Sequence, residues 1–546
     1  MDFLLEKTSS SFLEQVVATC LRTHELDELW RLGDPKDVVP QLPAAAMVHL
    51  FHLAEHEDRR ILLLHAAVEQ VQCCWDMDTW KRDRFDPAGA DEWLARIVEL
   101  PDEAFLEKIH GLLPDGFGLH LLSRVTIYNL KLDPDHPEDA AYYTTPDEYF
   151  ELQPLAETPE ESWSTIQRFV DRWYEFDATG IQQQLLATIM EFPTALEEES
   201  YRLRNGRIRD EGFWDAHSAQ EIYTPVDPAR ISFDRPRTPL DPPKVASFLP
   251  ATPAPEVRDV FARALAELTP EEQDAVRGNF ALLCNRMTAA DGIDIADDLG
   301  MSDVLERARA GVNLGLTYFV VHRSSAAEEI LRTLHVSRLF QCGYFLQKQT
   351  SSLAVTLMRT GVVSLSPGTS TLLEGPWSTF LSAQMERHPK LDPGFGGGLH
   401  PVSVSTLEQV ALITELLEEL SVFKGLCFEC LQLPAGLLTV EGAARTSRQS
   451  PGAITFGDLF RSAAVALVVK GKASAVPLTA PSVKKFFSDP ANLERAREQL
   501  KQALASFLAL PPRRIARIVD SHLAPLLAAS EAESILLLSR RPQKGA

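Results

Sequence analysis

The stretch TPEEQDAVRGNFALLCNRM, Thr269 to Met287, carries the plainest helix signature in the chain. Thr269 is a helix-capping residue, Pro270 suits the first helical position, and the carboxylate of Glu272 can reach back to the cap. Apolar residues then recur at spacings of three and four, which is the period of a helix with one buried face. They are Val276, Phe280, Leu283, Cys284 and Met287. The stretch predicts a long buried helix.

Two further stretches, Thr145–Glu148 and Thr158–Glu161, repeat the Thr-Pro-acid-acid signature and predict two more helix starts. Alternating strand-like runs are rare along the chain. Short β-branched runs at Tyr318–His322 and Val465–Val469 are either strands or parts of buried helices. We therefore expect a mainly α protein with few or no strands.

Residues 42–125 contain an internal similarity at an offset of 44 residues. It aligns Leu42-Pro43 with Asp86-Pro87 and pairs apolar positions such as Leu50 with Leu94. A period of this size is typical of stacked helical hairpins, in which each unit buries its apolar face against its neighbours. Chance similarity between amphipathic helices is the alternative.

The composition changes between residues 225 and 255, where nine prolines occur. Proline removes backbone donors and favours extended geometry, so this segment is either a linker or a strap lying across a surface. We predict a helical-repeat domain over 1–224, the Pro-rich segment over 225–255, a larger helical domain over 256–540, and a frayed tail over 541–546.

The composition is that of a folded, acidic protein. The chain has 546 residues, 45% of them hydrophobic, a formal net charge of -24 and a mean hydropathy of -0.10. The negative charge disfavours nucleic acid and anionic lipid as partners, and no apolar run is long enough to span a membrane. The N-terminus shows no export signal, and the seven cysteines are too few and too scattered for a disulfide framework. We expect a cytoplasmic protein.

The segment WDMDTWKRDRFDP, Trp75 to Pro87, concentrates acids, bases and tryptophans. Asp76 and Asp78 begin like a calcium loop, but the glycine and the final glutamate of that pattern are missing. Asp86 followed by Pro87 instead resembles the start of a helix, so a joint between two helical units is favoured. A weak cation site formed by Asp76, Asp78 and Asp83 is the alternative.

A second acidic cluster, ADGIDIADDLG over 290–300, includes Asp291 and Asp294. Magnesium needs only one or two carboxylates plus water, so these are weak metal candidates. Acids before the next helix are also what helix caps and the helix dipole favour, and this explanation is preferred. We expect no cofactor.

Other motif searches do not support an enzyme of a known class. Cys427 and Cys430 form the only CxxC, but the preceding segment is helical, which favours two buried thiols over a zinc or redox pair. The Gly-rich loop over 394–400 lacks the Lys-Ser/Thr of a P-loop, and no GxSxG or HExxH is present.

Several stretches together resemble a family of uncharacterised bacterial proteins of about this length. They are LPAAAMVHLFHLAEHEDRRILLL, WDMDTWKRDRFDP, LRNGRIRDEGFWDAHSAQEIYTPVDP, NRMTAADGIDIADDL and GVNLGLTYF. The resemblance implies no catalytic residues. Residues 42–125 also resemble the helical-repeat N domain of MgtE-type magnesium transporters, without that family's nucleotide-sensing modules or membrane spans.

Within the family resemblance, polar residues mark two segments. Gly212 looks like a helix C-terminal glycine, and Asn313, in an apolar context, would need buried hydrogen-bond partners. The functional hypothesis is a cytoplasmic scaffold or regulatory protein that binds another protein. The alternative is a ligand or cation sensor, or an enzyme, with a pocket in the second domain lined by Asn285, Asp291 and Asn313.

Overall fold

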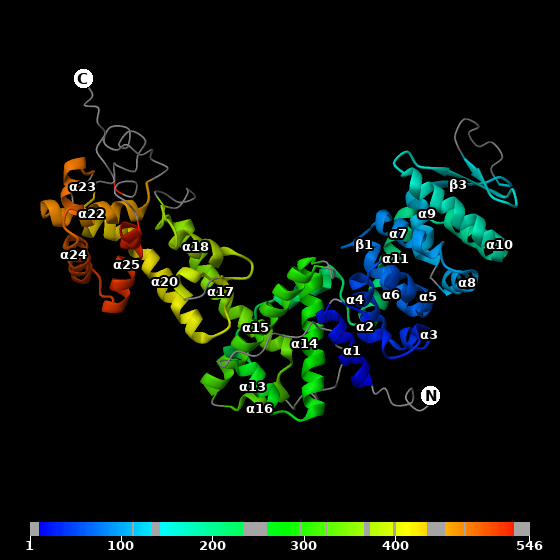
Figure 1. The fold of residues 1–546 in the computed structure, drawn as a ribbon, viewed down its shortest axis with the longest axis horizontal. Helices are drawn as coiled ribbons and strands as arrows, with labels where there is room; N and C mark the ends of the chain where they lie inside the picture. The colour runs from blue at the N-terminus through cyan, green and yellow to red at the C-terminus, as the bar shows by residue number, and fades with distance from the viewer. Residues whose placement is uncertain are drawn as a thin grey trace, which may run out of the picture. The chain divides into compact units, whose positions relative to one another are not determined.

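The computed structural model is mainly α, which confirms the fold class (Figure 1). It describes residues 10–23, 25–111, 114–132, 142–232, 259–293, 297–323, 325–364, 372–396, 400–433, 454–473, 477–528 and 535. Asp294, most of the Pro-rich segment (233–255) and the tail over 541–546 lie outside the described residues. None of the described helices combines the length and the apolar character that a membrane crossing requires.

The chain divides into two compact units. Unit 1 comprises Met1–Thr224, Ser232–Val312 and Phe319–Gln341, and unit 2 comprises Pro225–Ile231, Asn313–Tyr318 and Cys342–Ala546. These units do not divide at the Pro-rich segment. The predicted domain ranges 1–224 and 256–540 therefore stay a prediction.

Unit 1 begins with a series of short helices and two small sheets. Its elements are α1 (Ser10–Thr23), α2 (Asp27–Trp30), α3 (Pro35–Val38), η2 (Val39–Gln41), α4 (Ala44–Leu53), α5 (His56–His65), α6 (Val68–Asp78), β1 (Trp80–Lys81), β2 (Arg84–Phe85), α7 (Pro87–Ile97), α8 (Asp102–Gly111), α9 (Pro114–Arg124), β3 (Val125–Asn129), β4 (Tyr143–Thr144), β5 (Phe150–Pro154), α10 (Glu160–Met190), α11 (Pro193–Asp210), α12 (Ala216–Ala219) and η3 (Gln220–Tyr223).

Helices α4, α5 and α6 are followed by α7, α8 and α9 with matching lengths. The first three have 10, 10 and 11 residues, and the next three have 11, 10 and 11. The similarity at an offset of 44 therefore aligns runs of three helices rather than hairpins. Whether the two runs are a true repeat stays a prediction.

The stretch Thr145–Glu148 was expected to start a helix, and this is wrong. It is the turn between β4 and β5 of an antiparallel sheet with the order β3-β5-β4. The Thr145 hydroxyl accepts from the Phe150 amide at 3.1 Å, and Asp147 accepts from the Tyr149 amide at 3.1 Å. Thr-Pro-Asp also favours turns, and the strand that follows decides between the two outcomes.

The second Thr-Pro stretch does start a helix, although its threonine is not the cap. Helix α10 begins at Glu160, and the Thr158 hydroxyl instead donates to the Arg124 carbonyl at 2.5 Å. The helix is interrupted at Asp177, where the backbone leaves the helical region. Asp177 Oδ1 accepts from the Gly180 amide at 2.9 Å, so the carboxylate restarts the helix as an N-cap does.

The rest of unit 1 contains the helix that the opening stretch predicts. Its elements are α13 (Val260–Ala266), α14 (Pro270–Asp291), α16 (Ala327–Thr333) and parts of α15 (Asp298–Arg323) and α17 (Val336–Thr360). Thr269 accepts from the Glu272 amide at 3.3 Å, and Glu272 accepts from the Thr269 amide at 3.0 Å, which confirms the capping box. Residues 318–322 lie inside α15, so the helical alternative holds there.

Unit 2 is a separate helical body. Its further elements are η4 (Pro228–Arg230), α18 (Trp377–Met385), β6 (Lys390–Leu391), α19 (Pro393–Gly396), β7 (Val402–Ser403), α20 (Leu407–Gly425), η5 (Leu426–Cys430), α22 (Phe456–Lys470), α23 (Ala480–Phe487), α24 (Ala491–Phe507) and α25 (Pro512–Ala528). Residues 465–469 lie in α22 and are helical. Buried Arg461 holds Glu374 and Asp458, and Asp458 Oδ1 is 2.8 Å from Arg461 Nη2.

Two helix glycines of unit 1 give a matched test of the packing. A methyl group at Gly311 in α15 would lie 2.6 Å from the Phe340 ring, whereas one at Gly206 in α11 would meet nothing within 4 Å. Gly206→Ala should raise the free energy of unfolding by about 0.5–1 kcal/mol through helix propensity. Gly311→Ala should lower it by about 1–3 kcal/mol through overpacking. Urea unfolding of both variants measures this, and equal effects would contradict the packing of α15 against α17.

Candidate functional site

The segment Trp75 to Pro87 forms a joint between α6 and α7. Helix α6 ends at Asp78, β1 and β2 pair as a hairpin with Lys81 opposite Arg84, and Pro87 opens α7. Asp86 occupies the cap position, but its side chain makes no capping bond and instead pairs with Lys81 Nζ at 2.7 Å. The segment is thus a hairpin between two helices, with a loop of only two residues.

Asp76 holds the joint to α11. Its side chain is buried and accepts from Arg207 Nε at 2.7 Å, Arg207 Nη2 at 2.8 Å and Gln72 Nε2 at 3.0 Å. Arg204 Nε donates to the backbone carbonyl of Asp76 at 2.6 Å. A buried carboxylate needs this many donors to offset its lost hydration. The carboxylate of Asp76 is therefore occupied by protein donors in the interior.

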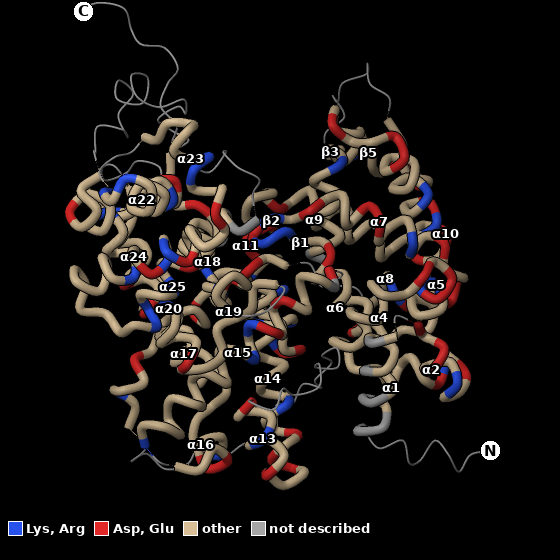
Figure 2. Tube along the Cα trace, turned by 60° about the vertical axis from the view of Figure 1, so that its left-hand side comes forward, with Lys and Arg blue, Asp and Glu red and all other residues tan. Residues whose placement is uncertain are grey.

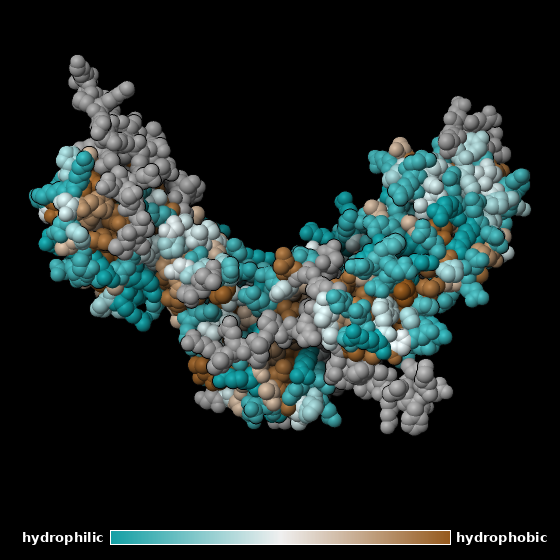
Figure 3. Space-filling model, viewed as in Figure 1, coloured by the Kyte–Doolittle hydropathy of each residue, from teal (hydrophilic) through white to brown (hydrophobic). Residues whose placement is uncertain are grey.

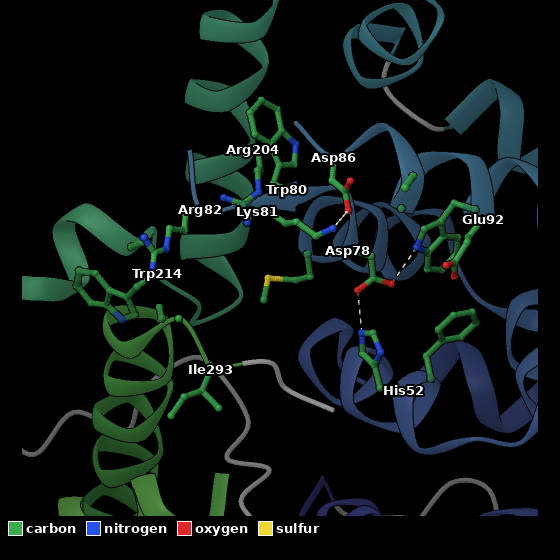
Figure 4. A pocket seen from close by; sticks show the side chains of 18 of the residues that line it. His52, Asp78, Trp80, Lys81, Arg82, Asp86, Glu92, Arg204, Trp214 and Ile293 are labelled. Atoms are coloured by element: carbon green, nitrogen blue, oxygen red, sulfur yellow. Dashed lines mark hydrogen bonds and ion pairs between the residues drawn. The ribbon is translucent and has the colours of Figure 1, made fainter. Parts of the chain in front are cut away.

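Asp78 has a different set of partners. One carboxylate oxygen lies 2.7 Å from His52 Nε2, and the other accepts from Trp93 Nε1 at 2.9 Å (Figure 4). Asp83, in the hairpin loop, is exposed and makes no hydrogen bond or ion pair within the described part of the chain. The three acids therefore do not converge, and no group of three or more possible metal ligands occurs among the described residues.

A cavity of about 610 Å³ opens at the joint, and we call it the joint cavity. Its lining comes from four separate stretches of unit 1. The lining residues are Phe51, His52, Arg59, Met77, Asp78, Trp80, Lys81, Arg82, Asp86, Ala88, Gly89, Glu92, Trp93, Arg96, Arg204, Trp214, Ala216, Ala289, Gly292 and Ile293. Residues far apart in sequence thus enclose one space.

Basic side chains outnumber acidic ones in the joint cavity. Its lining has five Lys or Arg residues and three Asp or Glu residues, although the chain as a whole has a net charge of -24. The β1–β2 hairpin contributes two of the basic side chains and appears blue in Figure 2. The cavity is therefore locally suited to a negatively charged group.

Most of these basic groups already have acceptors. Arg59 donates to the carbonyls of Phe51 at 3.0 Å and Ala54 at 2.8 Å, and burial lowers its pKa. Arg96 donates to Glu92 at 2.9 Å. The hydrogen bond to Asp86 raises the pKa of Lys81. These contacts hold the side chains in place along the walls of the cavity.

Aromatic side chains also contribute to the lining. Phe51 and Trp93 stack with ring centroids 4.7 Å apart, and the guanidinium of Arg204 lies 5.8 Å from the Trp80 ring. The guanidinium of Arg286 lies 4.3 Å from the Trp214 ring. Such rings exclude water, so polar contacts made inside the cavity are stronger than on an open surface.

The residues proposed for a pocket in the second domain have partners of their own. Asn285 donates to the Gly212 carbonyl at 3.3 Å, and Asp291 accepts from Tyr223 at 2.8 Å and from Arg307 at 2.7 Å. Asn313 belongs to unit 2, is buried, and donates to the Ser405 carbonyl at 2.9 Å. None of the three lines the joint cavity.

The structure also shows the conformation at Gly212 and the state of the two cysteines of the CxxC motif. Gly212 follows α11 in the left-handed conformation, as a helix C-terminal glycine does. Cys427 is buried, burial raises the pKa of its thiol, and Cys430 donates to the Ala503 carbonyl at 3.5 Å. Thiols in this state are poor nucleophiles and poor metal ligands. Residues 397–399 of the Gly-rich loop lie outside the described residues.

Sequence reasoning found only one wall of the joint cavity. The unusual composition of Trp75 to Pro87 marked the hairpin, which supplies Trp80, Lys81 and Arg82. Arg59, Arg204 and Trp214 lie in stretches that carry the family resemblance, but nothing in those stretches marks them as cavity residues. Their position at the cavity depends on how α5, α11 and the segment before α12 pack against the joint.

Comparisons with known proteins give one match. A family described as a family of unknown function, DUF6178, matches residues 6–541. No curated protein and no solved structure matches the chain. The comparisons do not support the similarity of residues 42–125 to magnesium transporters.

The roles of the joint acids can be separated by mutation. Asp76→Ala would leave Arg207 without its carboxylate and should lower the free energy of unfolding by about 3 kcal/mol or more. Asp83→Ala removes an exposed acid without a described partner and should change it by less than about 0.5 kcal/mol. Urea unfolding with and without Mg²⁺ measures both. A Mg²⁺-dependent stabilisation that Asp83→Ala abolishes would instead support a cation site.

Proposed function

We propose that this chain, which belongs to the DUF6178 family, binds a small molecule in the joint cavity. The observation that carries the proposal is the cavity itself. It has a volume of about 610 Å³ and is lined by polar and aromatic side chains from distant parts of the chain. Ligand sites of proteins typically have volumes of about 300–1,000 Å³ and a few polar groups among apolar ones. The alternative of a ligand sensor is thereby favoured, with its pocket in unit 1.

Several side chains of the joint cavity are held in place without a ligand. Asp78 is fixed by His52 and Trp93, and Arg59 is fixed by carbonyls at the end of α4. Side chains that are already ordered lose little conformational entropy on binding. This preorganisation supports a binding role.

A ligand in the joint cavity would contact parts of unit 1 that are far apart in the sequence. The hairpin at Lys81 and Arg82 lies on one side of the lining, and Ala289 and Ile293, at the end of α14, lie on another. A molecule that contacts both stabilises their arrangement by the free energy of its binding. Any ligand-binding protein is stabilised in this way, and a sensor can use that stabilisation; we propose no reaction.

Filling the joint cavity tests the proposal. Ala88 lines the cavity and is exposed, whereas Ala187 is exposed on α10 away from it. We expect a library of soluble metabolites to contain a compound that raises the melting temperature of the wild type and of Ala187→Trp. Ala88→Trp should lose this shift, because the indole occupies the site. Differential scanning fluorimetry measures the shifts.

A compound that stabilises Ala88→Trp as much as the wild type binds elsewhere and would contradict the joint cavity as its site. The thermal unfolding of the two tryptophan variants without ligand is the control for folding. Both variants should unfold within a few degrees of the wild type, because both substitutions are at exposed helix positions.

A second function, the binding of another protein, is favoured by the surface of α10. Its last part, residues 178–190, contains no charged residue. Leu186, Met190 and the following Phe192 are 41%, 71% and 78% exposed. On the face drawn in Figure 3, hydrophilic residues predominate and apolar ones are scattered. Large apolar side chains gathered at one helix end are typical of protein-binding surfaces.

Co-purification tests this second function. The double variant Met190→Ser/Phe192→Ser removes the two most exposed apolar side chains of this helix end, and Leu132→Ser removes one of similar exposure elsewhere. A protein that is enriched with the wild type and with Leu132→Ser should be lost with the double variant. Quantitative mass spectrometry of material purified from the native host measures the enrichment. Equal recovery with all three proteins would contradict docking at this surface.

A further inference from the structure

We propose that the ligand of the joint cavity is an anion, and that its phosphate or carboxylate group binds at Arg82 and Lys81. This inference rests on the proposed function, because it names the class of molecule that the same site takes. Phosphate and carboxylate share the chemistry in question, which is a pair of oxygen atoms that accept hydrogen bonds from a guanidinium.

Arg82 differs from the other basic residues of the lining. Arg59, Arg96 and Arg204 each donate to protein oxygens, and Lys81 pairs with Asp86. Arg82 makes no hydrogen bond or ion pair within the described part of the chain, although it lines the joint cavity. A guanidinium has five donors in a planar fork. Arg82 is exposed, so its donors face water, and an anion in the cavity would take the place of that water.

The backbone of Arg82 is held in a conformation that disfavours arginine. It is the first residue of the two-residue hairpin loop, and its φ is +63°. Turns of this kind prefer glycine, asparagine or aspartate at such a position. A non-glycine residue there costs of order 1 kcal/mol or more, and such residues cluster at functional sites. Glycine would adopt this conformation more easily. The presence of arginine therefore supports a functional use of its side chain.

Further positive charge gathers at the same end of the cavity. In Figure 4 the side chain of Arg82 lies beside Trp214. The guanidinium groups of Arg286 and Arg209 lie 4.3 Å and 5.7 Å from the Trp214 ring. Lys81 is close by, and its side chain is 77% exposed. Arg286, Arg209 and Lys81 pair with Glu221, Asp215 and Asp86, so Arg82 carries the positive charge at this end that no described acid neutralises.

A structural role for Arg82 makes a different prediction. Its Nε and Nη2 atoms lie 3.7 Å from the position that a Cβ at Gly292 would take, at the end of α14. The carbonyl end of a helix carries partial negative charge, which favours a cation. If this were the whole role of Arg82, its removal would lower stability without changing the affinity for anions.

Isothermal titration calorimetry on the full chain separates the two roles. The probes are pyrophosphate for a phosphate ligand, citrate for a carboxylate ligand, and glycerol as a neutral comparison. Arg82→Gln removes the charge, and Arg60→Gln is the matched control, because Arg60 is an exposed arginine of α5 outside the lining. We expect pyrophosphate or citrate to bind the wild type and Arg60→Gln. Arg82→Gln should bind at least about tenfold more weakly, as the loss of a charge-assisted hydrogen bond implies.

Equal affinity of Arg82→Gln and the wild type for the anion would overturn the inference, and so would an absence of binding by both anions. The proposed function fails separately. A neutral metabolite whose stabilisation is lost in Ala88→Trp and kept in Arg82→Gln leaves the joint cavity a ligand site and overturns only the anionic class. Circular dichroism of Arg82→Gln establishes that the variant is folded.

Discussion

The buried ion pair between Asp76 and Arg207 fixes the position of the joint. It links the last turn of α6 to α11, and Arg204 adds a bond from the same helix to the backbone of Asp76. Displacement of this pair is costly, because Asp76 alone would be left charged in the interior, whereas Arg207 is partly exposed. The hairpin, the indole of Trp80 and the carboxylate of Asp78 all follow Asp76 directly, so their positions depend on this contact.

The charged residues of the joint segment differ in how deeply they are buried and in their partners. Asp76 is neutralised in the interior, Asp78 is held between His52 and Trp93, and Lys81 is paired with Asp86. A mixed run of acids and bases in sequence is usually a solvated surface. Here most of its members are used in packing, and the positive charge of Arg82 is left at the cavity.

Local signals in the sequence predicted the features that depend on local interactions. The capping box at Thr269 formed as expected, since both partners lie within four residues. The helix start predicted at Thr145 was wrong, because the same residues also suit a turn. The pairing of β4 with β5 decided between the helix and the turn. The family and the mainly α fold were predicted correctly. That Arg59, Arg204 and Trp214 line one cavity could not be predicted, because only tertiary packing brings them together.

The lining of the joint cavity spans the chain from Phe51 to Ile293. During synthesis on the ribosome the hairpin and α7 emerge long before the end of α14, so the cavity has an open side until Ala289 to Ile293 have been translated and packed. A nascent chain that stops before this point has the charged groups of the site without its enclosure. Completion of the cavity therefore depends on residues that are translated long after the hairpin, although unit 1 itself continues to Gln341.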